Sequence, residues 1–267
     1  MAGRTFTIGD IHGDLGQLVD LLKRIGPIGR KDKVVFLGDY LDRGPRSREV
    51  IEFVRTTLPK TTGAKVVALR GNHEDAWLRV IDDGWDGFVL PPGNGCLACA
   101  RSFTGGPPPE LHDQPRSERE WEELLSGTFF PDDVVDWMRQ LPFWYEDEDA
   151  IYVHAGLPRV NGLFVHPSLV DNPAVLLWTR TMEFFKEYRG KTTIVGHTVT
   201  SLLPPELSCY APENPEDLWA GEQVIALDTG CGKGGFLTAI ELPELFVWES
   251  REPRRHLMTA SSSLLVG

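Results

Sequence analysis

Three polar side chains follow three short apolar segments near the start of the chain. They are Asp10 in Gly9–Gly13 (GDIHG), Asp39 in Gly38–Gly44 (GDYLDRG) and Asn72 in Gly71–Glu74 (GNHE). Successive motifs lie about 30 residues apart, which is the length of one strand–helix–strand unit. Since the turns that follow parallel strands share one edge of the sheet, Asp10, Asp39 and Asn72 are predicted to converge there.

Two later apolar segments each end in a histidine, His154 after 151–153 and His197 after 194–196. Together with His12 they complete a set of oxygen and nitrogen donors without thiolates, which suits Mn, Fe or Zn. Six groups are too many for one ion but can hold two when a carboxylate bridges them, and Asp39, central in the order, is the predicted bridge. Two cations about 3.5–4 Å apart can activate water and polarise a phosphoryl oxygen, so the pattern predicts phosphoester hydrolysis.

Short apolar segments alternate with helical periodicity over the first 82 residues, a pattern typical of an α/β fold with a parallel sheet. The predicted strands are Thr5–Ile8, Lys33–Leu37 and Lys65–Leu69, and the predicted helices are Leu15–Arg24, Ser47–Thr57 and Asp75–Asp82. We expect a second, more antiparallel sheet from Ile151–Val153, Thr193–Val195, Gln223–Leu227, Phe236–Ile240 and Leu245–Glu249. The Trp- and Pro-rich stretch 84–149 is predicted to be a cap-like insertion, and residues 251–267 a mobile tail.

The composition limits the partners. The chain has 267 residues, with 27 Lys and Arg against 39 Asp and Glu, which gives a formal net charge of −12. A field of this sign repels phosphate backbones and anionic lipids, so we predict no general nucleic-acid or membrane-surface binding. An anionic substrate must then be held by a local group of Arg, His or metal ions.

The start of the chain and the absence of an apolar run of about 20 residues favour a cytoplasmic location. Cys96 and Cys99 form a C-x-x-C pair without a second pair, and we interpret them as structural.

Five motifs occur in a fixed order: GDxHG, GDxxDRG, GNHE, HAG and GH, at Gly9–Gly13, Gly38–Gly44, Gly71–Glu74, His154–Gly156 and Gly196–His197. In these motifs the chain resembles the phosphoprotein phosphatase family of metallophosphoesterases, in its short bacterial Ser/Thr phosphatase form. The similarity spans about residues 4–245, because Leu227–Gly230 and Gly234–Thr238 also resemble the closing strands of that family. The resemblance implies a four-layer αββα sandwich with two mixed sheets. It also implies a calcineurin-like catalytic domain over residues 1–250, with a dinuclear metal site at the carboxyl-terminal edge of the strands.

The resemblance further assigns the ligands of two divalent metal ions. One ion would be held by Asp10, His12 and Asp39, and the other by Asp39, Asn72, His154 and His197. Manganese is the expected metal, with iron or zinc as alternatives. A hydroxide that bridges the two ions would attack the phosphorus directly.

Four further residues receive roles from the same resemblance. His73 would protonate the leaving oxygen, and Asp42 would be its carboxylate partner and fix its tautomer. Arg43 and Arg180 would bind phosphoryl oxygens through the planar guanidinium fork. Arg43 lies within a motif, whereas Arg180 follows the looser family pattern of a Trp and an Arg between HAG and GH.

The expected substrate is a phosphorylated protein or a small phosphoester. The alternative is a dinucleoside polyphosphate hydrolase, which cleaves an anhydride on the same scaffold. That branch tends to read GNHD and to lack an equivalent of Asp42, so Glu74 and Asp42 favour the Ser/Thr phosphatase. A catalytically silent scaffold is disfavoured because no ligand position is missing. The sequence leaves the oligomeric state open.

Overall fold

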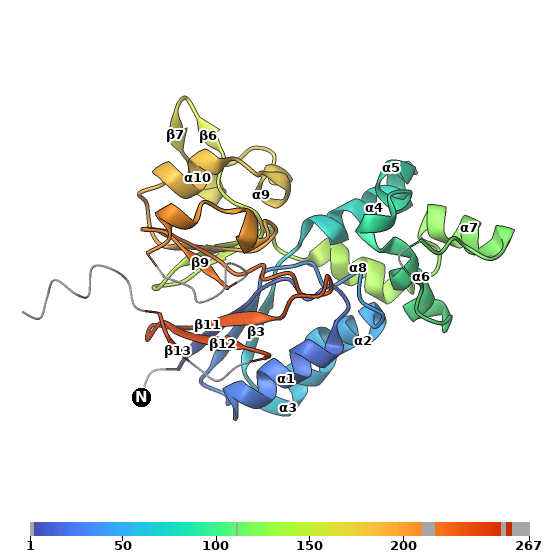
Figure 1. Cartoon of the computed structure of the whole chain (residues 1–267), viewed down its shortest axis with the longest axis horizontal. Helices are drawn as coiled ribbons and strands as arrows, with labels where there is room; N and C mark the ends of the chain where they lie inside the picture. The colour runs from blue at the N-terminus through green and yellow to red at the C-terminus, as the bar shows by residue number, and fades with distance from the viewer. Residues whose placement is uncertain (1–2, 111, 210–216, 252–254, 258–267) are drawn as a thin grey trace, which may run out of the picture.

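Two β-sheets form the centre of the computed structural model, which describes residues 3–110, 112–209, 217–251 and 255–257 (Figure 1). The larger sheet has the strand order β13-β12-β11-β1-β2-β3. Its strands are β1 (Thr5–Ile8), β2 (Lys33–Phe36), β3 (Lys65–Ala68), β11 (Thr238–Leu242), β12 (Phe246–Glu249) and β13 (Arg255–His256). As predicted, β1, β2 and β3 are parallel, and Thr5 lies opposite Lys33, which lies opposite Lys65.

The second sheet has the order β4-β5-β8-β10-β9. Its strands are β4 (Trp144–Glu146), β5 (Ile151–Val153), β8 (Thr193–Val195), β9 (Trp219–Ala220) and β10 (Val224–Ala226). The three central strands β5, β8 and β10 run parallel, and the edge strands β4 and β9 are antiparallel. A separate hairpin is formed by β6 (Arg159–Val160) and β7 (Leu163–Phe164).

The predicted membership of the second sheet is wrong for its last two strands. β11 and β12 join the larger sheet, where β11 pairs antiparallel with β1 and Ile8 lies opposite Ala239. All five residues of β11 are buried, so this strand covers an edge of β1 that would otherwise expose unpaired backbone groups. The second sheet is therefore parallel at its centre and not mainly antiparallel.

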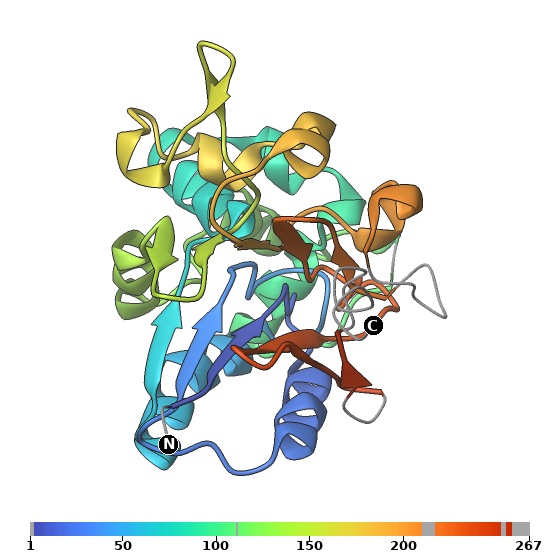
Figure 2. The ribbon, with the colours of Figure 1, turned by 90° about the vertical axis from the view of Figure 1, so that its left-hand side faces the viewer.

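The two sheets pack face to face with helices outside, which confirms the predicted αββα sandwich (Figure 2). The layer between the sheets is apolar and includes Val35, Leu37, Tyr152, Ile194, Leu227 and Ile240. The outer face of the second sheet packs against α9 (Val175–Trp178) and α10 (Met182–Glu187), mainly through Leu176, Phe184 and Phe185. The outer face of the larger sheet is covered by the helices that connect its parallel strands.

These connecting helices end close to the predicted positions. They are α1 (Leu15–Ile25) between β1 and β2, and α2 (Ser47–Glu52) and α3 (Leu58–Thr62) between β2 and β3, with a π-helical turn at Phe53–Thr57 that joins α2 to α3. The next helix, α4 (Asn72–Asp83), follows β3 and leads into the insertion. Helix α1 begins after Asp14, whose side chain accepts a hydrogen bond from Gln17 N, and it buries Leu18, Leu21 and Ile25. Helix α4 begins three residues earlier than predicted, directly after Gly71.

The predicted insertion is mostly helical and extends to one side of the sandwich, as Figure 1 shows. Its helices are α5 (Asp86–Val89), α6 (Cys96–Thr104), α7 (Glu118–Ser126) and α8 (Asp132–Gln140), with a 3₁₀ turn at Pro92–Asn94. Trp77 of α4 anchors them through edge-to-face contacts with Phe88, Phe129 and Phe130. The segment ends before residue 149, because β4 already belongs to the second sheet.

Three further 3₁₀ turns occur in the second half of the described chain, and part of the predicted tail is described as well. The turns are Pro167–Leu169, Thr200–Leu202 and Pro205–Leu207. Within 251–267, Arg255–His256 form β13 and pair with β12, so this part is a strand and not a tail. Residues 252–254 and 258–267 lie outside the described residues. None of the helices in the described ranges is both long and apolar enough to cross a bilayer.

One ion pair connects the two sheets at the end remote from the predicted site. Lys33 Nζ of β2 lies 2.5 Å from Asp147 Oδ2 in the turn between β4 and β5. Asp147 Oδ1 also accepts hydrogen bonds from Tyr152 Oη at 3.0 Å and Ala150 N at 3.2 Å. We expect Asp147→Asn to lower the free energy of unfolding by about 2 kcal/mol, because it leaves a partly buried ammonium without its counter-charge.

Urea unfolding measures this loss. The control is Asp20→Asn, which removes the exposed Asp20–Lys23 pair and is expected to cost under about 0.5 kcal/mol. Equal effects of the two substitutions would contradict the assigned role of Asp147.

Candidate metal centre

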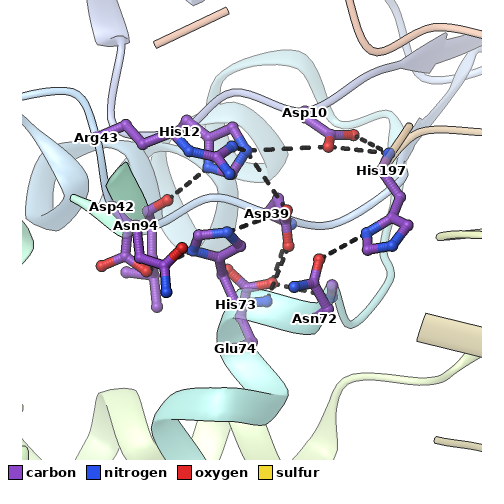
Figure 3. Close-up of polar contacts among 12 residues, drawn as sticks. Asp10, His12, Asp39, Asp42, Arg43, Asn72, His73, Glu74, Asn94 and His197 are labelled. Atoms are coloured by element: carbon purple, nitrogen blue, oxygen red, sulfur yellow. Dashed lines mark hydrogen bonds and ion pairs between the residues drawn. The ribbon is translucent and has the colours of Figure 1, made fainter. Parts of the chain in front are cut away.

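Side chains from separate turns meet at the carboxyl-terminal ends of the parallel strands (Figure 3). His12 Nε2 lies 3.4 Å from Asp39 Oδ2 and 3.9 Å from Asp10 Oδ2. His154 Nε2 lies 3.4 Å from Asp39 Oδ1 and 3.0 Å from Asn72 Oδ1, which in turn is 2.8 Å from His197 Nδ1. The structure therefore brings together all six of the predicted metal ligands, with Asp39 between the two groups.

The backbone at this edge adopts an unusual conformation. Five residues that are not glycine have left-handed φ angles: His12 at 48°, Asp39 at 53°, Asp42 at 70°, Arg43 at 66° and His197 at 64°. Such a conformation costs an L-residue about 1–2 kcal/mol and is found mostly where function requires it. These residues lie in the turns after β1, β2 and β8, three of the turns that contribute side chains to the cluster.

Two glycines of the motifs permit the close approach of these groups. A Cβ on Gly71 would overlap Asp39 Oδ1, and a Cβ on Gly196 would overlap Asp10 Oδ1. Because Gly196 has no side chain, both carboxylate oxygens of Asp10 accept hydrogen bonds from His197 N, at 3.2 and 3.0 Å. The glycines in GNHE and GH are therefore required by contacts with the ligand carboxylates.

The protonation of the imidazoles shows that the cluster suits a cation. His12 Nδ1 lies 2.9 Å from Leu41 O, and His154 Nδ1 lies 2.9 Å from Leu37 O. A carbonyl only accepts, so Nδ1 carries the proton and each Nε2 presents a lone pair to the cluster. The His154 Nε2 lone pair thus faces the Asn72 and Asp39 oxygens without a proton between them. Such a convergence of acceptors favours a bound metal ion.

Electrostatics and unpaired atoms lead to the same conclusion. Burial, Asp228 and Asp39 raise the pKa of Asp10 well above its usual value, because the neighbouring carboxylates repel one another. His197 Nε2 and Asp228 Oδ2 are buried without a hydrogen-bond partner among the described residues. A divalent cation would offset this repulsion. Two overlapping groups could hold one: His12, Asp39 and His73, and Asp10, Asp39 and His154.

The histidines of the cluster are in the form that binds metals. Burial, with the nearby Arg43 charge, lowers the pKa of His12 well below its usual value. Burial also lowers the pKa of His154, and burial with the His154 and Arg180 charges lowers that of His197. All three imidazoles are therefore neutral near pH 7 and can donate a lone pair to a metal ion.

His73 pairs with Asp42 as predicted. His73 Nδ1 lies 2.6 Å from Asp42 Oδ2, and Asp42 also accepts from Trp77 Nε1 at 2.9 and 3.1 Å. This arrangement fixes the ring so that Nε2 faces the cluster, 3.9 Å from Asp39 Oδ2. The free thiols Cys96 and Cys99 are buried beside this pair, in agreement with a structural role.

The two predicted arginines differ in position. Arg43 donates through Nη1 to His12 Nε2, and so lies at the cluster. Arg180 is exposed and follows α9, and its charge reaches His197. The structure therefore brings Arg43 into the cluster and leaves Arg180 at its rim.

Glu74 is a buried residue of the site that the sequence analysis assigned no role. Its Oε2 accepts from Asp39 N and Gly71 N, both at 2.9 Å, and its Oε1 accepts from Tyr40 N at 2.8 Å. It thereby links the turns after β2 and β3. Burial and Asp39 raise its pKa to about 8, although the three N–H donors favour the ionised form. The signal was present as the glutamate half of a capping box, a Glu three residues after the Gly71 N-cap whose carboxylate accepts from the Gly71 N–H.

Two more residues were missed. Asp228 follows β10 and is buried beside Asp10, at the same kind of strand end that led to Asp10 and Asp39. Lys233 lies in the following glycine-rich turn, where its charge interacts with Asp228 and Arg43. No sequence pattern pointed to Lys233, because its place depends on how the turn folds over His12.

A buried set of carboxylate, amide and imidazole donors at the strand ends of a two-sheet α/β sandwich defines a metal-dependent hydrolase. The sequence profile of the calcineurin-like phosphoesterases matches residues 3–201. The chain belongs to this family, which confirms the predicted metallophosphoesterase superfamily.

Curated relatives cover most of the chain. A protein of Chromohalobacter salexigens named bis(5'-nucleosyl)-tetraphosphatase, symmetrical, is 30% identical over 296 residues, covering 89% of this chain and 94% of the relative. One of the same name from Marinomonas is 26% identical, covering 90% and 94%. The asymmetrical bis(5'-nucleosyl)-tetraphosphatase PrpE of Anoxybacillus flavithermus is 25% identical, covering 89% and 90%. None of these three names is that of a Ser/Thr protein phosphatase.

Two solved structures share the fold. A putative diadenosine tetraphosphatase superposes with a TM-score of 0.55 at 21% identity, covering 93% of each chain. A cold-active protein-tyrosine phosphatase of a Shewanella species gives 0.58 at 20% identity, covering 97% of this chain and 81% of the other. At these identities the comparison supports the fold alone.

The Glu74 contacts generate a prediction about stability. In Glu74→Gln one oxygen becomes an NH₂ group that cannot accept, so one of three backbone N–H groups is left facing a donor. We expect the free energy of unfolding to fall by about 2 kcal/mol, because a buried donor loses its partner. The measurement is denaturant unfolding of the metal-free protein at about pH 9, above the Glu74 pKa of about 8, so that the wild-type side chain is ionised. Glu52→Gln on the exposed face of α2 is the control. A loss no greater than that of the control would contradict this role.

Proposed function

We propose that this metallophosphoesterase hydrolyses dinucleoside polyphosphates, with a tetraphosphate bridge as the preferred substrate. The observation that carries the proposal is the similarity to bis(5'-nucleosyl)-tetraphosphatases over about nine-tenths of both chains. For the protein of Chromohalobacter salexigens, the alignment covers 89% of this chain and 94% of the relative. The proposal replaces the first-ranked protein phosphatase of the sequence analysis with its alternative.

The residues at the strand ends would hold two divalent metal ions, with Mn²⁺ expected. Asp10, His12 and Asp39 would hold one, and Asp39, Asn72, His154 and His197 the other. When bound, such ions lower the pKa of water and polarise a phosphoryl oxygen. The unprotonated nitrogens and the repelling carboxylates described above support this assignment.

The remaining residues would orient the substrate and move a proton. Arg43, at the cluster, would bind two phosphoryl oxygens through its fork, and Arg180 at the rim would contact a more distant phosphate. His73 would keep its Nδ1 proton on the Asp42 side and present Nε2 to the leaving oxygen. Glu74 would position Asp39 by holding its backbone.

A phosphomonoesterase, including a protein phosphatase, is the second candidate. It is favoured by the His73–Asp42 hydrogen bond of 2.6 Å, because an alkoxide leaving group needs protonation more than a nucleotide phosphate does. The two candidates therefore predict different substrate preferences for one site.

A substrate panel tests the proposal. With Mn²⁺ we expect kcat/KM for diadenosine tetraphosphate to exceed that for phosphoserine, phosphothreonine and phosphotyrosine peptides by about 100-fold or more. Exhaustive chelation is expected to abolish activity, and elemental analysis of the reloaded protein to find about two ions per chain. Preference for a phosphopeptide would establish the second candidate instead, and full activity after chelation would exclude both.

The role of His73 is tested with leaving groups of different basicity. We expect His73→Asn to lower kcat on an alkyl phosphate by about 10²–10⁴-fold, and on diadenosine tetraphosphate by no more than about tenfold. The reason is that the anhydride leaves as a weakly basic phosphate. His166→Asn, on a half-buried histidine paired with Glu146, is the control. Equal losses on the two substrates would argue against proton donation.

A further inference from the structure

A cavity of about 320 Å³ lies beside the candidate metal centre, between the helices α5 to α7 and the turn at Gly232–Lys233. Arg43, Gly232 and Lys233 line the end nearest the metal ligands. This end adjoins the cluster directly, because a Cβ on Gly232 would meet the Cβ of His12 and lie 3.5 Å from the Cβ of Arg43. The mechanism described above makes no use of the rest of this space.

The other walls are mainly apolar. They include Leu90, Leu97 and Trp121, with prolines at 91, 92, 109 and 115. Leu90 is 53% exposed, so its side chain is accessible to an occupant of the cavity that it lines. Glu110 and Asp113 add carboxylates to the same walls. An occupant with a planar ring, hydroxyl or amino groups and an anionic end would match these surfaces.

The cavity lies on the side of the cluster where the leaving group would depart. The His73 ring packs edge-to-face against Phe88, with centroids 5.2 Å apart. Phe88 belongs to α5, and the next two residues, Val89 and Leu90, line the cavity. Since His73 would protonate the leaving oxygen, the group attached to that oxygen would extend past Phe88 into the cavity.

Lys233 supplies a positive charge at the junction. It is exposed, and its side chain makes no hydrogen bond or ion pair with the described part of the chain. In a chain of net charge −12, a second cation next to Arg43 is a specific feature. It fits a phosphate adjacent to the one under attack, a group that a monoester lacks.

We propose that this cavity binds the nucleoside of the leaving nucleotide, and that Lys233 binds the phosphate between that nucleoside and the scissile bond. The inference rests on the proposed function. It names the residues that would select a polyphosphate over a monoester. A peptide fits less well, because an extended chain needs a groove with backbone partners, and a space of this size accommodates a single compact group.

Binding of two probes to the Mn²⁺-loaded protein tests the cavity and Lys233 separately. By calorimetry we expect Leu90→Asp to raise the Kd for ADP by about tenfold or more, with less than about a twofold change for pyrophosphate. Lys233→Met is expected to raise both values by about tenfold, because both probes carry the second phosphate. The matched controls are Leu163→Asp on the exposed β6–β7 hairpin and Lys60→Met on α3, expected to stay within about twofold for both probes.

Turnover then separates this inference from the proposed function. If wild-type protein hydrolyses diadenosine tetraphosphate but Leu90→Asp leaves the Kd for ADP unchanged, the cavity assignment is overturned and the proposed function stands. If Leu90→Asp weakens ADP selectively but wild-type protein does not hydrolyse the tetraphosphate, the nucleoside site stands and the proposed substrate falls. A Lys233→Met protein that binds pyrophosphate as tightly as wild type would overturn the role of Lys233.

Discussion

The convergence of buried lone pairs with no proton between them is the constraint on which this structure depends. Leu41 O and Leu37 O accept hydrogen bonds from the Nδ1–H groups of His12 and His154, so each Nε2 carries a lone pair. The His154 lone pair faces the Asp39 and Asn72 oxygens, whereas that of His12 lies near Asp39 and accepts from Arg43. Burying unpaired acceptors and repelling carboxylates costs several kcal/mol unless a cation compensates. The arrangement is therefore that of a site suited to metal ions, and the surrounding backbone must hold the side chains in this geometry.

The fold holds this geometry with a strained backbone at the strand ends. Five left-handed residues lie in turns that contribute side chains to the cluster, and Glu74 holds two of the turns together through three backbone N–H groups. The parallel strands of both sheets end at the same edge, so five separate turns can contribute. Strain in one turn is tolerated because neighbouring turns and the buried layer between the sheets hold it in place.

Under the proposed function, the cluster constrains the reaction and the residues around it select the substrate. The His73–Asp42 pair suits a basic leaving group, whereas the cavity lined by Leu90 and Trp121, with Lys233 at its inner end, suits a nucleotide. Both features lie on the leaving-group side and involve the helical segment 86–140. Variation in this segment could thus change the substrate while the strand-end ligands remain the same.

The sequence by itself determined the parallel strands β1 to β3, their connecting helices and the six predicted ligand residues that meet at the strand ends, because each of these residues follows a short apolar segment within a local motif. It did not determine that β11 and β12 join the larger sheet, since strand partners are chosen by which edge remains uncovered. Nor did it show that Lys233 adjoins Arg43, or that helices α5 to α7 and the turn at Gly232–Lys233 enclose a cavity. Those features arise from contacts between distant segments, which local spacing does not record and which only the packed tertiary structure decides.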